Sequence, residues 1–318
     1  MQLSDLVTFR NKLNELSLLP TQVNSDMDMN LVRNLMTQSP DQFKNFQSQI
    51  DQQANIIHEK FSDFESLLTQ LKHEVDCLIV QEEKQWFQQS YDLYDKEMCN
   101  ETTEYILNRK QTLSADIQEL FTTRLRNYTD WRFPGLVVRP GLEKFVTTMV
   151  SNDPLYLVDQ HRDLLQPTVD SFPQAYQRRL RCYVVNERKD NPILHKIPDN
   201  QFGICLVYNF FNFRPVELIR QWLTELFVKL KPGGVLIMTI NDCDRESAVV
   251  LAQNAFACYT PGRMILTLAE SIGFEVLYFW NDWGPVSWIE LKRPGQLSSM
   301  RGGQTLAKII SKTVAESK

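Results

Sequence analysis

The chain has 318 residues and a mass of 37.2 kDa, enough for one large domain or two of ordinary size. Its hydrophobic fraction of 43% and charged fraction of 23% are typical of a folded globular protein and exclude wholesale disorder. Residues 1–130 carry 12 Lys and Arg against 21 Asp and Glu, a net charge of −9, whereas residues 131–318 carry 22 against 18, a net charge of +4. All 11 glycines lie at or after Gly135, so we expect a different kind of structure on each side of residue 130.

The sequence carries no recognisable targeting signal. Its apolar stretches fall short of the ~20 residues that a membrane-spanning helix needs, and the N-terminus lacks the pattern of a secretory signal. The six cysteines form no CxxC pair, which favours reduced thiols. We therefore expect a cytoplasmic protein that does not bind a membrane. A net charge of +4 without a long Lys/Arg stripe does not indicate nucleic-acid binding.

The first 130 residues have the pattern of amphipathic helices. From Phe43 to Leu78, apolar residues recur at mostly alternating steps of three and four, a heptad seam of about five heptads. The segment Ser39-Pro40-Asp41 is a helix-start signal. Two further runs keep a helical spacing: Phe87, Tyr91, Tyr94 and Met98, then Leu113, Ile117, Leu120, Leu125 and Tyr128.

An amphipathic helix cannot bury its apolar stripe alone. Either the three predicted helices fold back into a bundle, or chains associate through an intermolecular coiled coil. In both cases residues 1–130 are an interaction element, and we expect self-association or a protein partner through this region. It shows no pattern typical of catalysis.

From residue 131 onward, short β-rich runs alternate with helical patterns. This alternation predicts a mostly parallel sheet with helices on both faces, which binds its ligands at the carboxyl ends of the strands. The expected strands are residues 135–138, 155–158, 181–185, 202–208, 235–240, 274–279 and 286–291, the last two forming a hairpin. The expected helices are residues 142–150, 164–180, 216–230 and 261–272.

Four segments of this half follow one another at a familiar spacing. They are Leu155–Asp159, 197–207 (IPDNQFGICLV), 230–240 (LKPGGVLIMTI) and 269–277 (AESIGFEVL). In this order they resemble strand two with its terminal acid, the approach to strand four, the turn into strand five, and the last helix with strand six of class I S-adenosylmethionine-dependent methyltransferases. The resemblance covers about residues 133–294.

The resemblance implies an α/β, Rossmann-like class I methyltransferase fold at residues 131–294. An all-α region, a coiled coil or helical bundle, precedes it at residues 1–130, and a basic tail follows at residues 295–318. The implied cofactor is S-adenosylmethionine, and the implied activity is methyl transfer to an acceptor that the sequence does not identify. The alternative is a catalytically inactive protein of this fold that acts as a structural or assembly component through its helical region.

The resemblance also places cofactor-binding residues at the ends of the first, second and fourth strands. Asp159 stands where the family binds the ribose hydroxyls, because a carboxylate accepts two hydrogen bonds from a diol. Without a cofactor, an Asp at this position is also a common helix cap. Gln160 lies beside it, and Tyr208 follows strand four.

The glycine-rich loop after strand one departs from the family pattern. Only Gly141 remains of its glycines, and Arg139 and Glu143 stand at two of the other glycine positions. Val137 stands at the position of an acidic residue. Arg139 would bind the carboxylate of the cofactor, as arginine commonly does. The lost glycines and acid favour the inactive alternative, whereas the intact motifs of strands two and five favour the enzyme.

Three residues are the catalytic candidates. Asn209 follows strand four, Asp242 follows strand five, and Tyr259 lies in a turn that would face the acceptor. Each also fits an ordinary polar or helix-start turn. Two acids at a spacing of two, such as Asp242 and Asp244, usually mark a polar loop, so we expect no metal site.

Overall fold

The computed structural model of the protein describes six ranges of residues: 3–17, 40–98, 103–108, 113–140, 144–281 and 284–297. The chain divides into two compact units, Met1–Lys84 and Gln85–Lys318. The candidate residues Gly141 and Glu143 lie outside the described ranges.

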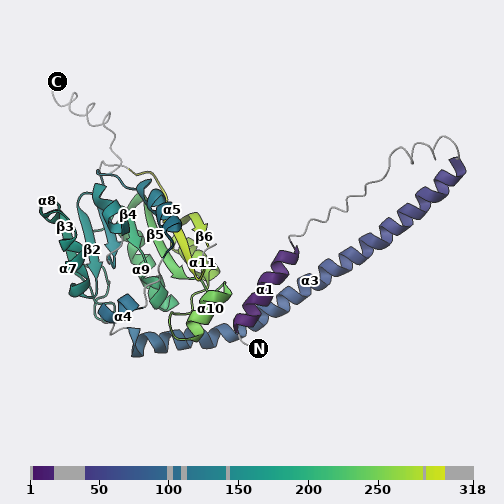
Figure 1. Cartoon of the computed structure of the whole chain (residues 1–318), viewed down its shortest axis with the longest axis horizontal. Helices are drawn as coiled ribbons and strands as arrows, with labels where there is room; N and C mark the ends of the chain where they lie inside the picture. The colour runs from purple at the N-terminus through teal and green to yellow at the C-terminus, as the bar shows by residue number, and fades with distance from the viewer. Residues whose placement is uncertain are drawn as a thin grey trace, which may run out of the picture. The chain divides into compact units, whose positions relative to one another are not determined.

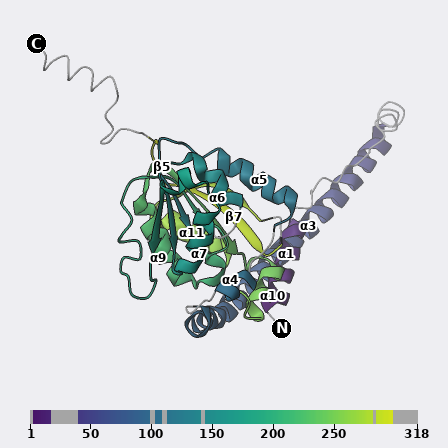
Figure 2. The same cartoon turned by 60° about the vertical axis from the view of Figure 1, so that its left-hand side comes forward.

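The first unit consists of helix α1 (Leu3–Ser17) and the larger part of helix α3 (Pro40–Lys96). α3 is 57 residues long and joins the first two predicted helical runs, because no glycine or proline interrupts it after Pro40. α1 lies alongside α3 (Figures 1 and 2). Among the residues of this unit whose burial is described, the buried apolar ones are Leu3, Leu6, Val7 and Leu13 of α1 with Val75 and Ile79 of α3.

The second unit is built on a seven-stranded sheet in the order β3-β2-β1-β4-β5-β7-β6. Strands β3, β2, β1, β4 and β5 are parallel, whereas β7 runs antiparallel between β5 and β6. The predicted mostly parallel sheet, with a hairpin at its end, is therefore confirmed. The strands are β1 Gly135–Val138, β2 Leu155–Asp159, β3 Leu180–Val184, β4 Phe202–Val207, β5 Leu230–Asn241, β6 Glu275–Trp280 and β7 Val286–Lys292.

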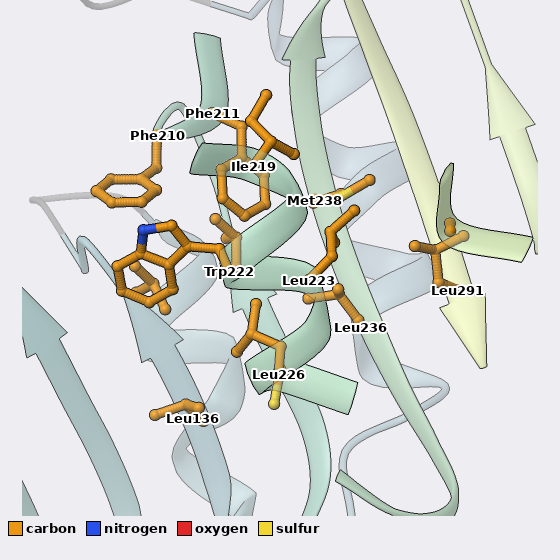
Figure 3. Close-up of a cluster of buried hydrophobic side chains, with 14 of the residues drawn as sticks. Leu136, Phe210, Phe211, Ile219, Trp222, Leu223, Leu226, Leu236, Met238 and Leu291 are labelled. Atoms are coloured by element: carbon orange, nitrogen blue, oxygen red, sulfur yellow. The ribbon is translucent and has the colours of Figure 1, made fainter. Parts of the chain in front are cut away.

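Helices cover both faces of the sheet. Successive strand residues point to opposite faces, so the two faces form two separate apolar clusters. One holds Leu136 and Leu236 against Trp222, Leu223 and other helical residues (Figure 3). The other holds their strand neighbours Val137 and Ile237. The helices are α4 Thr103–Asn108, α5 Ala115–Arg126, α6 Lys144–Thr148, α7 Arg162–Asp170, α8 Gln174–Gln177, α9 Val216–Lys229, α10 Glu246–Gln253 and α11 Gly262–Ile272.

The third predicted helical run, now α5, packs on the sheet. The Phe121 ring stacks on Trp288 of β7, with the ring centroids 3.9 Å apart and the planes 10° apart. Because the sheet uses the apolar face of α5, the three predicted runs do not form a bundle of their own. The boundary between the two units lies after Lys84, whereas the composition changes near residue 130.

Two local features differ from the expected pattern. Helix α9 ends at Lys229, and β5 begins at Leu230, so the Lys-Pro-Gly-Gly segment lies within the strand. Gly233 has a φ of +84°, a conformation that glycine tolerates and other residues rarely adopt. Helix α10 was not expected, because its buried residues are mostly small and follow a polar loop.

Candidate functional site

The order of the strands marks the end of β1 as the place where a ligand would bind. This strand is hydrogen-bonded to β2 on one side and to β4 on the other, so the chain order reverses here. In open α/β sheets, ligands bind outside the carboxyl ends of the strands at such a switch point. The residues at these ends are Arg139 after β1, Asp159 at the end of β2, and Tyr208 and Asn209 after β4.

Arg139 and Asp159 form a buried ion pair at this switch point. Val138 pairs with Val158 in the parallel register, which brings the two following residues side by side. Arg139 Nε donates to Asp159 Oδ2 at 3.3 Å, and the side chains are only 4% and 0% exposed. The other carboxylate oxygen, Oδ1, accepts the backbone N–H of His161 at 2.9 Å. Both oxygens of Asp159 are thus engaged within the protein.

Phe210 lies against two buried guanidinium groups. The Cζ atom of Arg139 is 4.9 Å from the centroid of the Phe210 ring, and the Cζ atom of Arg214 is 3.9 Å from it. Such cation–π contacts are strongest where water is excluded, and both Phe210 and Arg214 are buried. The loop after β4 therefore brings an aromatic ring to the arginine that follows β1.

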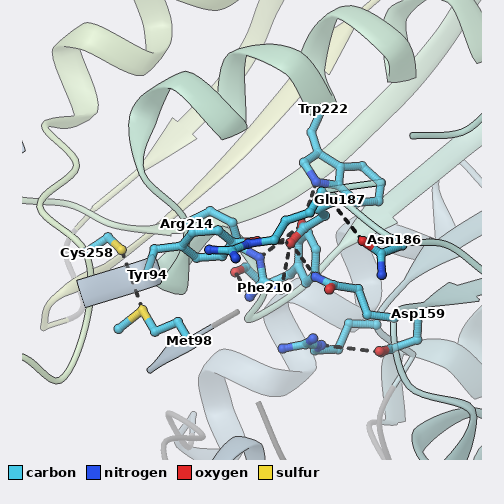
Figure 4. A network of polar contacts seen from close by, with 12 residues as sticks. Tyr94, Met98, Asp159, Asn186, Glu187, Phe210, Arg214, Trp222 and Cys258 are labelled. Atoms are coloured by element: carbon cyan, nitrogen blue, oxygen red, sulfur yellow. Dashed lines mark hydrogen bonds and ion pairs between the residues drawn. The ribbon is translucent and has the colours of Figure 1, made fainter. Parts of the chain in front are cut away.

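A buried carboxylate, Glu187, continues this network (Figure 4). It follows β3 and accepts hydrogen bonds from Trp222 Nε1 at 2.7 Å and from Tyr94 Oη at 2.6 Å. Arg214 Nε donates to it at 3.2 Å, and the amide of Gln160 donates to it as well. A buried charge is tolerated only when paired and hydrogen-bonded, and Glu187 meets both conditions. The structure thus uses Gln160, a predicted cofactor ligand, to bind Glu187.

The C-terminal end of α3 packs on the segment that holds Tyr259. Within the second unit, Ser90 Oγ accepts the backbone N–H of Tyr259 at 2.7 Å, and the Phe87 ring meets the Tyr259 ring edge-on at 5.3 Å. Met98 Sδ lies 3.7 Å from the Cys258 thiol. Tyr259 is fully buried by these contacts and its own surroundings. This candidate acceptor-facing residue thus packs in the protein interior.

Asp242 holds together three elements at the end of β5. Its Oδ1 accepts the backbone N–H of Gly262 at 2.9 Å, and its Oδ2 accepts the Ser287 hydroxyl at 2.6 Å. Burial raises the pKa of Asp242, and the nearby Asp244 raises it further. Because Gly262 begins α11 and Ser287 belongs to β7, the Asp242 carboxylate joins both to β5.

The remaining candidates also contact the body of the fold. Asn209 has a φ of +51°, donates its backbone N–H to Thr239 Oγ1 at 2.8 Å and accepts a hydrogen bond from Asn212 at 3.0 Å. The Tyr208 ring packs edge-on against Phe145 at 4.9 Å. The structure therefore pairs Arg139 with Asp159 and Gln160 with Glu187. Tyr208 instead belongs to the apolar cluster that contains Val137 and Ile237.

The described ranges contain neither a cluster of metal-ligating side chains nor a membrane-spanning helix. Among these residues, no three His, Cys, Asp or Glu side chains gather closely enough to hold a metal ion. None of the helices in the described ranges combines the length and apolar character needed to cross a bilayer.

Comparison with known proteins finds similarity of structure alone. No family model matches the chain, and no curated protein sequence matches it. Similar solved structures include an O-methyltransferase family protein from Burkholderia thailandensis, with a TM-score of 0.45, 11% identity, and coverage of 56% of this chain and 57% of that one. The N-methyltransferase NodS from Bradyrhizobium japonicum WM9 has a TM-score of 0.42 and 11% identity, covering 57% and 98%. The [4+2]-cyclase SpnF has a TM-score of 0.44 and 13% identity, covering 56% and 81%.

The second unit has an α/β, Rossmann-like fold, and a helical region precedes it in the chain. The fold alone does not decide whether it transfers methyl groups, because function depends on the residues of the site.

Proposed function

We propose that this protein has a methyltransferase fold without methyltransferase activity and serves as a structural component, with its helical region as the assembly element. The observation that carries this proposal is the buried Arg139–Asp159 ion pair at the switch point. Each carboxylate oxygen of Asp159 already accepts one hydrogen bond, from Arg139 and from the N–H of His161. A carboxylate can accept further hydrogen bonds, but the Asp159 side chain is 0% exposed, so a ribose diol reaches it only if the ion pair opens. The residues as arranged therefore do not fit S-adenosylmethionine.

The cost of opening this pair is large compared with the affinity of an ordinary cofactor site. Removing one partner from a buried ion pair costs about 3–5 kcal/mol. A micromolar site corresponds to about 8 kcal/mol of binding free energy. If Arg139 had to leave Asp159, the affinity would fall to roughly the millimolar range. The end of α3 further supports the proposal, because it contacts the loop segment in which an acceptor-facing residue was expected.

Calorimetric titration of the full chain tests the proposal. We expect no binding of S-adenosylmethionine or S-adenosylhomocysteine at concentrations up to about 1 mM, in line with the cost of opening the pair. Asp159→Ala should give the same flat titration, and so should Asp163→Ala, an exposed acid on α7. Submillimolar binding by the wild type that is lost in Asp159→Ala and kept in Asp163→Ala would overturn the proposal.

A second candidate is a methyltransferase for an unidentified acceptor. The observation that favours it is backbone strain at the switch point: Arg139 and Asn209, at the ends of the adjacent strands β1 and β4, have φ values of +54° and +51°. Non-glycine residues held in this conformation are concentrated at active sites. In this case Arg139 would exchange the Asp159 carboxylate for that of the cofactor, and the new ion pair would offset the cost of opening the old one. The titration above would then show submillimolar binding that depends on Asp159.

A further inference from the structure

The part of α3 that lies in the first unit carries a stripe of exposed apolar side chains. Phe61, Phe64, Leu71 and Leu78 are 40%, 50%, 38% and 45% exposed. Leu67, beside them, is 65% exposed. Scattered exposed apolar residues are normal, but a contiguous row of large ones marks an interaction surface. We call these five residues the α3 stripe.

The spacing of the α3 stripe is that of a coiled-coil seam. Phe61 occupies an a position of a heptad repeat, and Phe64, Leu71 and Leu78 occupy d positions, with Leu67 at a g position beside them. Of the intervening a positions, Leu68 is half-buried and Val75 is already buried within the first unit. In the sequence the seam begins at Phe43, and the backbone is already helical from Pro40. It therefore extends for roughly 36 residues, or about 54 Å of helix. Apolar a and d positions sustained over at least three heptads indicate a coiled coil.

The charges that flank the α3 stripe are complementary to those of an identical helix. With Phe61 at an a position, Lys60 occupies the preceding g position and Glu65 the following e position. In a parallel two-stranded coil, a g residue faces the e residue five positions later on the other helix. Lys60 of one copy would thus face Glu65 of the second copy, and the two-fold axis would repeat the pair. Both side chains are exposed.

We infer that the α3 stripe binds the same stripe of a second copy of this chain, as a parallel two-stranded coiled coil about a two-fold axis. This inference rests on the proposed assembly function and names its partner. The exposed a and d residues Phe61, Phe64, Leu71 and Leu78 bury one another across the axis, which removes their apolar surface from water. The flanking Lys60–Glu65 pairs set the orientation of the two helices.

The mass of the full chain in solution, measured by light scattering after size exclusion, tests the inference. We expect twice the chain mass of 37.2 kDa for the wild type. Phe64→Glu/Leu71→Glu should give the mass of a single chain, because it places four charges in the seam of the pair. Ser66→Glu/His73→Glu is the matched control, since both residues are exposed at f positions on the opposite face of the helix. It should keep the doubled mass. A single-chain mass for the wild type, or the same doubled mass for the stripe variant, would overturn the inference.

Exchanging the charges of Lys60 and Glu65 tests whether the two α3 helices run parallel. Lys60→Glu should raise the dimer dissociation constant about fivefold, because two attractive pairs become repulsive. Lys60→Glu/Glu65→Lys should return it to the wild-type value, since each pair is then restored with reversed sign. Failure of the double exchange to restore the affinity would contradict the parallel arrangement. These measurements use no cofactor, so failure of the inference is distinguishable from failure of the proposed function.

Discussion

Replacing Glu187 with alanine should lower the free energy of unfolding by about 3–5 kcal/mol, the cost of removing one partner from a buried ion pair. The substitution leaves the buried guanidinium of Arg214 without its carboxylate, and it removes the acceptor for Tyr94 and Trp222. Glu187 thereby connects the end of α3, helix α9 and the loop after β3 in one network (Figure 4). Urea unfolding followed by far-UV circular dichroism measures the change.

Two further variants make the test for Glu187 specific. Glu187→Gln keeps an oxygen acceptor but loses the charge. Its free energy of unfolding should therefore lie between those of the wild type and Glu187→Ala. Glu270→Ala removes an exposed carboxylate from α11 and should change stability by less than about 0.5 kcal/mol. If Glu187→Ala were no more destabilising than Glu270→Ala, the buried network would not contribute as described.

The second large effect is expected at Glu290, which joins α5 to the sheet. Its side chain is fully buried. The carboxylate accepts hydrogen bonds from Arg124 Nε at 2.5 Å, Tyr128 Oη at 2.7 Å and Trp288 Nε1 at 3.0 Å. Glu290→Ala should cost about 3 kcal/mol. The effect is smaller than at Glu187 because Arg124 is 27% exposed and water can solvate it in part.

Glu290 also makes the stability of the fold depend on pH. Burial alone would raise its pKa, but hydrogen bonds from Arg124, Trp288 and Tyr128 outweigh burial and hold the pKa below the ordinary 4.5. A carboxyl group with a lowered pKa stabilises the fold above its unfolded-state value and loses this contribution as the pH falls through its folded-state value. The wild type should therefore lose stability below pH 4.5 more steeply than Glu290→Gln, which has no such group.

Unfolding free energies of the two proteins between pH 7 and pH 3 measure this difference. Glu275→Ala is the matched control on the neighbouring strand β6, because Glu275 is exposed and its partner Lys292 lies at 3.1 Å. An exposed pair contributes about 0–1 kcal/mol, so this variant should follow the wild type across the range. Parallel loss of stability by wild type and Glu290→Gln would contradict the assigned role.

Much of the fold follows from local patterns in the sequence. Residues 202–207 form an apolar run without polar alternation, as expected for a central strand covered on both faces, and β4 is buried at every position. Two elements could not be predicted from the local sequence pattern. The Lys-Pro-Gly-Gly segment is a strong helix stop, but its place inside β5 depends on pairing with neighbouring strands. The eight residues of α10 are too short for a clear helical period.

The sequence identifies residues of the candidate site, but it does not predict which of them contact one another. Arg139 and Asp159 were both expected at the switch point, yet their pairing depends on the register of β1 and β2, which no local pattern fixes. Glu187 was missed altogether. Its position directly after β3, at the carboxyl edge of the sheet, was the available signal. Its partners Tyr94 and Trp222 lie 93 and 35 residues away in the sequence, beyond the reach of motif spacing.

A double-mutant cycle between Arg139 and Asp159 tests most directly whether their ion pair forms at the switch point. The unfolding free energies of the wild type, Arg139→Ala, Asp159→Ala and the double variant give the coupling between the two side chains, and contributions from their other partners cancel. We expect a coupling of about 2 kcal/mol or more, because each single change leaves the other charge buried. Effects that add within about 0.5 kcal/mol would contradict the account, because they would mean that the two side chains do not pair.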